Sequence, residues 1–249
     1  MTTDSTHTSL VGKVALVTGG GTGLGAAASR HLAGAGAAVA VNWSRSRRQA
    51  EEVVAAVHAA GGRALDVQAD VSDEAAVGEM VQEVERLLGP VTLLVNNAGV
   101  TRWVPAEDIQ AITSRDWQAI LGVNLIGAWN CVRAVAPGMR AEGGAIVNVA
   151  SDSVFFLEGS SIPYVVSKAA LATLTEVLAR TLAPGIRVNA VAPGWMVTPW
   201  LDRYLPEPRR AEVVGGGEGT VAVDEVAAEI VRLLADGEAN GLVVRLSGD

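Results

Sequence analysis

The chain has 249 residues, of which 49% are hydrophobic and 18% charged, a composition typical of a folded globular protein and not of a disordered one. Its formal net charge of −8 argues against nucleic acid and anionic membrane surfaces as partners. The single cysteine, Cys131, excludes an internal disulfide and fits a reducing compartment, and its apolar helical surroundings predict a small core residue.

At the amino end, residues 1–10 are expected to form a disordered or loosely attached tail. Residues 1–9 are polar and lack the basic-then-apolar layout of a signal peptide. No apolar stretch along the chain reaches membrane-spanning length without a polar interruption. We therefore expect a soluble, cytoplasmic protein.

Short β-branched apolar runs alternate with alanine-rich helical stretches along the rest of the chain. Strands are predicted at 13–18, 37–42, 64–68, 91–96, 145–150, 187–191 and 242–246. Helices are predicted at 24–35, 47–60, 74–88, 114–140, 163–182 and 224–234. This alternation implies right-handed βαβ units and an α/β fold: one doubly wound parallel sheet of about seven strands with helices on both faces. We see no interdomain linker, so residues 11–249 are predicted to be one domain.

The long segment 194–220 is rich in Pro, Gly and Trp and shows no regular periodicity. Irregular stretches of this length in a compact domain are usually lids or disordered loops. We predict a lid.

A glycine-rich turn, Thr18-Gly-Gly-Gly-Thr-Gly-Leu-Gly25, follows the first predicted strand and opens the first helix. Glycines there let the backbone approach a pyrophosphate, to which the helix N-terminus offers N–H groups and a positive dipole end. A glycine-rich turn without a ligand is the alternative, but the strand–turn–helix context favours a dinucleotide. The residues assigned to this contact are Gly19, Thr22, Gly23, Leu24 and Gly25.

The second predicted strand ends at Asn42, where many NAD sites place an acidic residue for the ribose 2′-hydroxyl. The chain instead continues Trp-Ser44-Arg45-Ser-Arg-Arg. Guanidinium groups suit a 2′-phosphate, so NADP(H) is favoured over NAD(H), with Arg45 the strongest candidate and Ser44 beside it. A solvated helix start is the alternative. Asp70 and Val71, after the third strand, are assigned to the adenine amino group, although Asp70 could equally be a helix cap.

Tyr164 and Lys168 are four residues apart and therefore lie on one face of a helix. A free tyrosine has a pKa of about 10, which makes it a poor base near neutral pH. A nearby ammonium favours the phenolate and lowers that pKa. The pair indicates a phenol tuned to give or take a proton, although the same spacing is common on amphipathic helices.

Several motifs occur in one order along the chain. They are Thr18-Gly-x-x-x-Gly-x-Gly25, Asn96-Asn-Ala-Gly99, Asn124, Ser151, Tyr164-x-x-x-Lys168 and Asn189-Ala-Val-Ala-Pro-Gly194. From Val11 to about Leu246 the chain resembles the short-chain dehydrogenases/reductases of the single-domain type. The resemblance implies a Rossmann fold and hydride transfer between a nicotinamide and a carbonyl or alcohol.

The resemblance also implies roles for individual residues. Tyr164 would be the general acid in reduction and the general base in oxidation, with its pKa lowered by Lys168, which would also hold the nicotinamide ribose. Ser151 would hydrogen-bond the substrate oxygen, and Asn124 would support a water that passes protons to Lys168. Further cofactor contacts are implied at Asn97, Ala98, Gly99, Pro193, Gly194 and Thr198. Each has an alternative without a ligand. Asn97 to Gly99 would form a strand-exit turn, Pro193 and Gly194 a Pro-Gly turn, and Thr198 would only begin the lid.

Most aromatic residues of the chain fall on segments that should surround the substrate. The pocket candidates are Trp103, Ser153, Phe155, Phe156, Trp195, Trp200 and Tyr204. A site lined in this way prefers an apolar or aromatic substrate. The alternative is that several of these rings bury in a subunit interface or fold the lid on itself.

The partners are predicted from charge and from helix faces. The 3-oxoacyl-carrier-protein reductases are close in pattern, but they dock an acidic carrier on basic residues, and segments 141–145 and 183–185 supply no cation here. We therefore expect a free small-molecule carbonyl or alcohol. Helices 114–140 and 163–182 are apolar on more than one face, which predicts a homodimer or homotetramer.

Two alternatives and one absence complete these expectations. A non-catalytic NADP-binding regulator is one alternative, and a different chemistry on the same scaffold, including reduction of an imine, is the other. The three histidines, His7, His31 and His58, lie far from all of these motifs. A zinc site or a Ser-His-Asp triad would lack its usual ligand or base, so no metal is expected.

Overall fold

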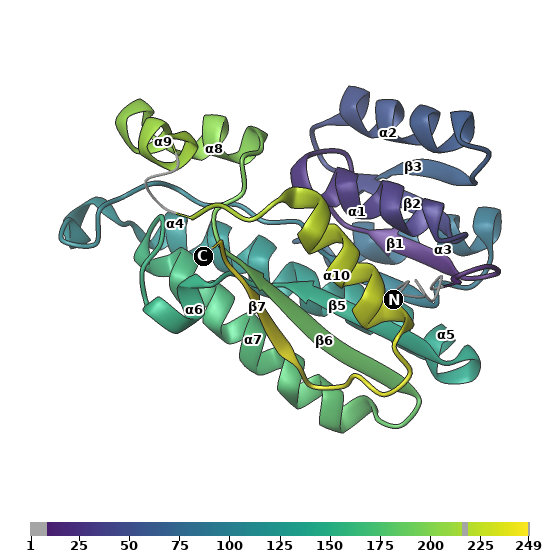
Figure 1. Ribbon diagram of the computed structural model, residues 1–249. Helices are drawn as coiled ribbons and strands as arrows, with labels where there is room; N and C mark the ends of the chain where they lie inside the picture. The colour runs from purple at the N-terminus through teal and green to yellow at the C-terminus, as the bar shows by residue number, and fades with distance from the viewer. Residues whose placement is uncertain (1–8, 216–218, 249) are drawn as a thin grey trace, which may run out of the picture.

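Seven parallel strands form one twisted sheet, seen at the centre of the computed structural model in Figure 1, which describes residues 9–215 and 219–248. The strands are β1 (Val14–Val17), β2 (Ala38–Trp43), β3 (Ala64–Gln68), β4 (Leu93–Asn96), β5 (Gly144–Val149), β6 (Ile186–Pro193) and β7 (Val243–Leu246). Their order is β3-β2-β1-β4-β5-β6-β7. The chain therefore winds outward from β1 in two directions, which confirms the predicted doubly wound Rossmann sheet.

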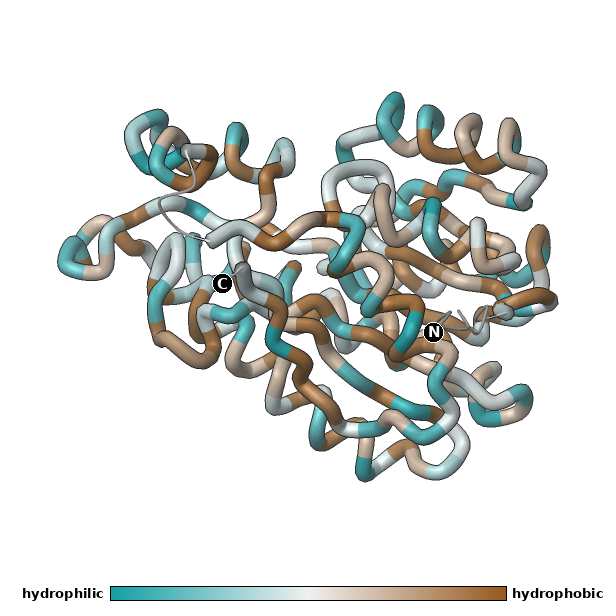
Figure 2. Tube along the Cα trace, viewed as in Figure 1, coloured by the Kyte–Doolittle hydropathy of each residue, from teal (hydrophilic) through white to brown (hydrophobic). Residues whose placement is uncertain are grey.

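Helices cover both faces of the sheet and make two separate apolar layers. One face carries α1 (Gly23–Gly34), α2 (Arg47–Ala59) and α10 (Val223–Ala235). The other carries α3 (Glu74–Leu88), α5 (Ala128–Glu142) and α7 (Ile162–Leu182). Strands buried on both faces read as continuous apolar runs, as β1 does, and Figure 2 shows hydrophobic residues concentrated along the central strands.

The predicted helix 114–140 is one continuous helix of three parts. It begins as α4 (Ser114–Leu121), passes through one π-helical segment, η2 (Gly122–Gly127), and continues as α5. The Thr113 hydroxyl accepts a hydrogen bond from the N–H of Asp116, whose carboxylate accepts one from the N–H of Thr113, so a complete capping box starts the helix.

The segment 194–220 is not irregular throughout, and that prediction is wrong for most of its length. It holds α8 (Pro199–Tyr204) and α9 (Glu207–Val214), while residues 216–218 lie outside the described residues. Thr198 caps α8 through its side chain, and Pro199 occupies the first helical position. Two further short helices were not predicted, η1 (Ile109–Ala111) and α6 (Ser153–Phe156).

Leu10 does not belong to the tail predicted for residues 1–10. Leu10 is buried in the core, and its N–H donates to the carbonyl of Ala35 at 2.8 Å. Residues 1–8 lie outside the described residues.

Two helices, Ser114–Glu142 and Ile162–Leu182, are long and apolar enough to cross a membrane by length and composition. Both helices carry polar side chains along their length, such as Asn130 and Thr175, so the prediction that no apolar stretch of this length is free of a polar interruption is not contradicted. The evidence for a membrane is weak, because both helices pack on the sheet and carry polar groups inward. Asn130 donates to the carbonyl of Val71 at 3.0 Å, and Thr175 accepts from the amide of Asn148 at 2.9 Å. These are the contacts of core helices.

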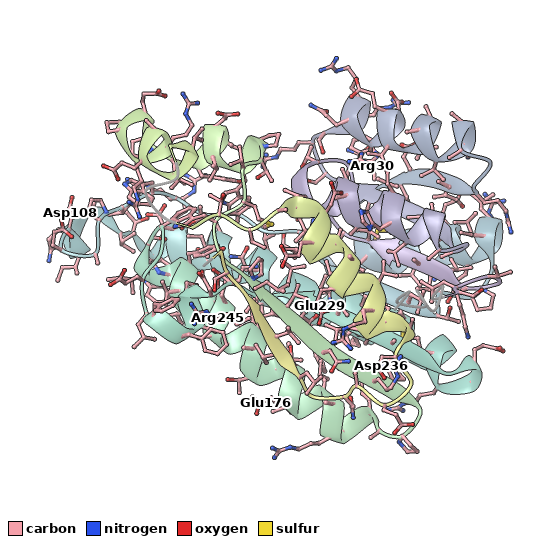
Figure 3. The ribbon with its side chains drawn as sticks, in the orientation of Figure 1. Arg30, Asp108, Glu176, Glu229, Asp236 and Arg245 are labelled. Atoms are coloured by element: carbon pink, nitrogen blue, oxygen red, sulfur yellow. The ribbon has the colours of Figure 1, made fainter. Side chains whose placement is uncertain are left out.

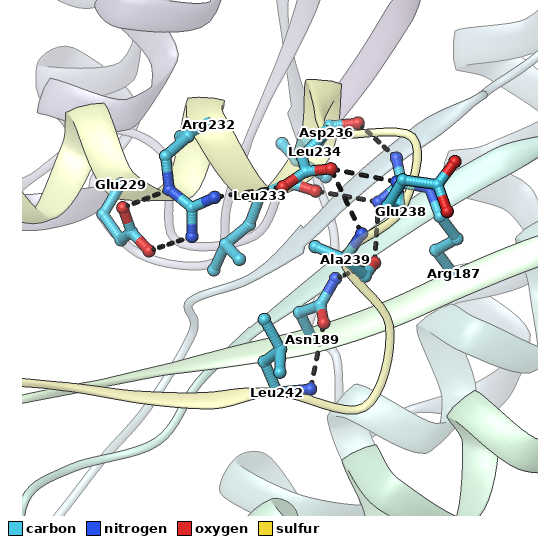
Figure 4. Close-up of polar contacts among 10 residues, drawn as sticks. All are labelled: Arg187, Asn189, Glu229, Arg232, Leu233, Leu234, Asp236, Glu238, Ala239 and Leu242. Atoms are coloured by element: carbon cyan, nitrogen blue, oxygen red, sulfur yellow. Dashed lines mark hydrogen bonds and ion pairs between the residues drawn. The ribbon is translucent and has the colours of Figure 1, made fainter.

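A polar network ties β6 to the connection between α10 and β7 (Figure 4). The Arg187 guanidinium donates to the carbonyls of Leu233, Leu234 and Ala239 at 2.7 to 3.0 Å, so it satisfies acceptors at the end of α10. Asn189 donates to the carbonyl of Ala239 at 2.8 Å and accepts from the N–H of Leu242 at 3.0 Å. Asn189 therefore positions the last strand. Asn189 itself lies in the middle of β6 and not at the carboxyl end of that strand.

Candidate active site

The carboxyl ends of the parallel strands meet at one edge of the sheet, and the predicted site residues follow them. The glycine turn follows β1, the segment from Asn97 follows β4, and Ser151 lies two residues beyond β5. This edge, where the winding direction reverses beside β1, is where open α/β sheets bind their ligands.

The glycine turn makes a backbone cradle that larger residues could not form. Gly19 and Gly23 have φ of +61° and +49°, a region that side chains disfavour. A Cβ on Gly25 would lie 2.2 Å from the carbonyl oxygen of Gly19. Helix α1 begins there with no acidic residue in its first turn, and the Thr22 side chain makes no capping hydrogen bond. These features fit a pyrophosphate, because N–H groups and the positive end of the helix dipole are left for an anion.

The cradle is held against β4 by hydrogen bonds to Thr18. The Thr18 hydroxyl accepts from the N–H groups of Asn97 and Ala98, both at 3.0 Å. The Asn97 amide donates to the carbonyl of Thr18 at 2.9 Å. Asn97 and Ala98 therefore stabilise the conformation of the cradle. Gly99 follows them, and a Cβ there would lie 3.5 Å from Asn124 and 3.7 Å from the Trp200 indole.

Three arginines, Arg45, Arg47 and Arg48, follow the end of β2. The strand runs one residue further than predicted, to Trp43, which is buried and donates to Asp66 at 2.9 Å. Ser44 and Arg45 follow and are exposed. Arg47 and Arg48 form ion pairs with glutamates one turn along α2, whereas Arg45 has no ion-pair partner within residues 9–215 and 219–248.

Asp70 does not cap a helix, which was the alternative role considered for it. Its carboxylate accepts from the N–H and the hydroxyl of Ser72, at 3.0 and 2.7 Å, in the turn after β3. The cap of α3 is Asp73, which accepts from the N–H of Ala75 at 2.9 Å. Val71 beside Asp70 is buried.

The four predicted catalytic residues lie on two helices and one turn: Asn124 on η2, Ser151 in the turn after β5, and Tyr164 and Lys168 on α7. Burial raises the pKa of Tyr164 to about 12, a hydrogen bond with Ser151 opposes that rise, and the charge of Asp152 adds to it. The expectation that Lys168 lowers this pKa is not met. Desolvation disfavours the phenolate more than the neighbouring groups stabilise it.

Lys168 faces the backbone of β5. Its side chain is 4% exposed, and Nζ donates to the carbonyl of Val149 at 2.6 Å and lies 5.8 Å from the centre of the Tyr164 ring. Burial lowers the pKa of Lys168 to about 8. The ammonium is therefore close enough to influence the phenol, but it is held by a different partner.

Asn124 connects the strand exit to α7. Its Oδ1 accepts from the N–H of Val100 at 2.8 Å, and its Nδ2 donates to the carbonyl of Val100 and to the hydroxyl of Ser167, at 3.0 and 2.9 Å. The Ser167 hydroxyl in turn donates to the carbonyl of Tyr164 at 2.7 Å. Asn124 lies in the π segment, and such segments are frequent at functional sites.

The substrate-pocket candidates separate into two groups. Trp103, Trp195, Trp200 and Tyr204 pack against one apolar cluster formed by Leu201, Leu205 and Val213. The centres of the Trp200 and Tyr164 rings lie 6.2 Å apart. Phe155 and Phe156 lie apart on α6, where each is about half exposed. Ser153, also on α6, is buried, and its hydroxyl has no partner within the described part of the chain.

Arg245 of β7 covers one of those exposed rings. Its guanidinium lies 4.4 Å from the centre of the Phe156 ring, and Figure 3 labels it near the carboxyl end of the strand. A cation over an aromatic ring is attracted to it, so Arg245 holds the Phe156 side chain in its position.

The remaining cofactor candidates lie where β6 leaves the sheet. Pro193 ends β6, and the N–H of Gly194 donates to the carbonyl of Leu246 at 2.7 Å. Thr198 caps α8, and its Cβ lies 3.3 Å from where a Cβ on Gly23 would stand. The residue that precedes α8 therefore lies against the glycine cradle.

Sequence reasoning missed Asp152, whose charge acts on the Tyr164 phenol. Its position next to Ser151 was the available signal. No group of three or more His, Cys, Asp or Glu side chains that could hold a metal occurs among residues 9–215 and 219–248.

Comparison with known proteins identifies the fold family. The short chain dehydrogenase profile matches residues 13–208. This chain belongs to the short-chain dehydrogenase/reductase family. It is 38% identical over 239 residues to a candidate ketoacyl reductase of the granaticin polyketide synthase of Streptomyces violaceoruber, covering 94% of each chain. It is 39% identical over 188 residues to the 3-oxoacyl-[acyl-carrier-protein] reductase FabG of Staphylococcus epidermidis, covering 75% of this chain and 76% of that protein.

A solved structure resembles this short-chain dehydrogenase over nearly its whole length. Gluconate 5-dehydrogenase from Burkholderia cenocepacia, solved in complex with NADP and tartrate, superposes with a TM-score of 0.87 at 30% identity, covering 97% of this chain and 96% of that one. The protein is therefore an oxidoreductase of this family, and the geometry above describes its candidate site.

Proposed function

We propose that this short-chain dehydrogenase transfers a hydride between NADP(H) and a carbonyl or secondary alcohol of a free small molecule, with Tyr164 as general acid and base. The observation that carries the proposal is that the buried Ser151, Tyr164 and Lys168 group lies at the same sheet edge as the glycine cradle. Ketoacyl reductases among the relatives of the chain support carbonyl reduction.

The nicotinamide, when bound, supplies or accepts the hydride. The Ser151 and Tyr164 hydroxyls donate to the substrate oxygen and stabilise the negative charge that develops there. Tyr164 then gives its proton to that oxygen, and in the reverse direction it takes the proton back. With a pKa of about 12, Tyr164 holds the proton that reduction needs at neutral pH. Lys168 is the cation nearest the phenol, and Asn124 fixes α7 at Tyr164 through Ser167.

The activity of this site is tested with NADPH oxidation against a panel of aliphatic, aryl and steroid-sized ketones. We expect turnover, and faster turnover of bulky apolar ketones, because aromatic rings of the lid lie beside Tyr164. Better turnover of small polar ketones would contradict the apolar substrate. Cofactor binding without turnover of any carbonyl would favour the non-catalytic regulator instead.

The preference for NADP(H) rests on Arg45. Replacing Arg45 by Ala should weaken NADPH roughly tenfold to a hundredfold, the range of a lost charge-assisted contact, and change NADH by less than about threefold. Titration of cofactor fluorescence measures both constants. Arg48→Ala is the matched control, because it removes the same charge from a residue paired with Glu52. Equal losses for NADPH and NADH on Arg45→Ala would remove the argument.

The pH dependence follows from Lys168. Because its pKa is about 8, the ammonium beside the phenol is lost as pH rises through that value, while Tyr164 stays protonated up to about 12. We expect kcat for reduction to be constant below pH 8 and to fall above it, because the lost ammonium no longer stabilises the phenolate that forms when Tyr164 gives up its proton. Lys168→Arg should move the falling limb upward. A flat reduction profile up to pH 10 would be inconsistent with this assignment.

A carrier-bound substrate is the second candidate, favoured by the FabG relatives. Segments 141–145 and 183–185 carry no cation for an acidic carrier, so we propose the free substrate instead. The two are separated by comparing an acyl carrier thioester with its short thioester analogue. Strong preference for the carrier form would establish the second candidate.

We also propose that the protein is a homodimer or homotetramer. Ile126 and Trp129 on the long helix and Ile162, Val166 and Val177 on α7 are large apolar side chains left exposed. Faces of this kind are covered by a second copy in symmetric oligomers. Light scattering measures the mass, and a monomer would refute the proposal.

A further inference from the structure

Ser153 is fixed in the reacting region by its backbone. It lies two residues after Ser151 and is the first residue of α6, which packs against α7 (Figure 1). Its N–H donates to the Ser151 hydroxyl oxygen at 3.2 Å. Ser153 therefore belongs to the same turn as the hydroxyl that is proposed to hold the substrate oxygen.

The Ser153 side chain and the Tyr164 ring both lie against Gly159. A Cβ on Gly159 would lie 3.5 Å from the Cβ of Ser153 and 3.4 Å from Cδ1 of Tyr164. The two side chains are thus within van der Waals distance of the same point. Since the Ser151 hydroxyl is hydrogen-bonded with Tyr164, the hydroxyl-bearing side chains of Ser151, Ser153 and Tyr164 gather in one region of the site.

The Ser153 hydroxyl is buried and makes no hydrogen bond to any part of the chain that the structure describes. Only 4% of the residue is exposed. Burying a hydroxyl without a partner is costly, and most buried hydroxyls are paired. Nearby serines follow that rule, since the Ser160 and Thr101 hydroxyls lie 2.6 Å apart and the Ser167 hydroxyl donates to the carbonyl of Tyr164 at 2.7 Å. A partner from outside the chain accounts for the exception at Ser153.

The chemistry of a hydroxyl restricts what that partner is. A serine hydroxyl donates one hydrogen bond, accepts others and carries no charge. A neutral carbonyl or hydroxyl oxygen matches it, whereas an ionised group would be buried without compensation of its charge. Because Ser153 is in direct contact with Ser151, the matching oxygen belongs to the substrate and lies close to the reacting carbonyl.

We propose that the Ser153 hydroxyl binds a second, neutral oxygen of the substrate, close along its chain to the carbonyl held by Ser151 and Tyr164. The proposal rests on the proposed carbonyl reduction and narrows the substrate class to ketones with a nearby carbonyl or hydroxyl group, such as β-keto esters and β-hydroxy ketones. Aromatic side chains beside Tyr164, such as Trp200, are left for the apolar remainder of the molecule. Ser153 is then a specificity-determining residue that takes no part in proton transfer.

Two aryl ketones of equal chain length test the proposal, with NADPH as the reductant. Ethyl benzoylacetate carries an ester carbonyl close to the reacting ketone, and phenyl pentyl ketone replaces that ester by a plain alkyl chain. Ser153→Ala should lower kcat/KM for ethyl benzoylacetate roughly fivefold to tenfold, as expected for one neutral hydrogen bond, and that for phenyl pentyl ketone by less than about twofold. Because each ketone is compared with itself in the two proteins, the greater intrinsic reactivity of the β-keto ester cancels.

Ser161→Ala is the matched control. Ser161, at the start of α7, also has a buried hydroxyl without a partner in the described part of the chain, and there it is not hydrogen-bonded to Ser151. This variant should change kcat/KM for both ketones by the same factor. Ser153→Ala should leave the midpoint of urea unfolding unchanged or higher, because the hydroxyl that it removes makes no hydrogen bond within the fold.

The possible outcomes separate this inference from the proposed function. An equal loss of kcat/KM for both ketones in Ser153→Ala, or no loss for either, overturns the inference alone. The same discrimination in Ser161→Ala, or a lower urea midpoint of Ser153→Ala, also overturns it, as does wild-type turnover of phenyl pentyl ketone but not of ethyl benzoylacetate. Absence of wild-type turnover with every ketone of the panel is a failure of the proposed function, and the inference then fails with it.

Discussion

Replacing Tyr164 by Phe is expected to lower kcat for NADPH-dependent carbonyl reduction by about a thousandfold, within the range that general acid–base catalysis contributes. The ring and its packing against Trp200 remain, but the proton donor and half of the hydroxyl pair at the substrate oxygen are lost. Binding of NADPH should stay within about threefold of wild type, since cradle and Arg45 are unchanged. Steady-state kinetics and cofactor fluorescence measure the two effects.

Two comparisons make this result specific. Ser151→Ala should also lower kcat, because Ser151 hydrogen-bonds the same phenol. Phe156→Leu is the comparison, because it removes a half-exposed aromatic ring that Arg245 already contacts, and we expect a much smaller effect on kcat. Turnover of Tyr164→Phe at more than a tenth of the wild-type rate would remove Tyr164 from the role of proton donor.

Replacing Gly25 by Ala should abolish tight cofactor binding and destabilise the protein. The new Cβ would lie 2.2 Å from the Gly19 carbonyl oxygen and 2.5 Å from the Asn97 amide. The first of these atoms is backbone, so the cradle must deform. We expect a free energy of unfolding lower by about 2 kcal/mol, typical of overpacking, and an NADPH affinity at least roughly a hundredfold weaker.

Gly34→Ala is the matched control, because Gly34 ends the same helix and a Cβ there has no neighbour within 4 Å. It should leave NADPH binding unchanged and stabilise the fold by a few tenths of a kcal/mol. Urea unfolding and NADPH titration measure both variants. Wild-type affinity in Gly25→Ala would show that the turn does not carry the pyrophosphate.

The sheet and its main helices were predictable because their signals are local. Continuous apolar runs define the buried strands, and the bounds of β3 and α3 agree with the prediction residue for residue. Helices α8 and α9 were missed because they are short and held by tertiary contacts, such as those of Trp195 and Tyr204 with Leu205 and Val213. Only Thr198 with Pro199 carried a local sign of α8.

The electrostatics of the site could not be read in the same way. The Tyr164 and Lys168 spacing places both side chains on one helix face, but it says nothing about depth. Burial reverses the expected direction of the Tyr164 pKa and brings that of Lys168 to about 8. The position of Arg203 beside Tyr204 likewise depends on where the lid folds, which no motif specifies.

The π segment at Gly122–Gly127 has a consequence for how the chain tolerates length changes. A π turn contains one residue more than an α turn, so α4 and α5 are out of phase by about 100° relative to an unbroken helix. That phase difference lets α4 face α7 while α5 faces α3. Deleting one residue from this segment would restore a regular helix and rotate one half against its neighbour. Insertions and deletions, harmless in most surface loops, should therefore be poorly tolerated at this one point inside a helix.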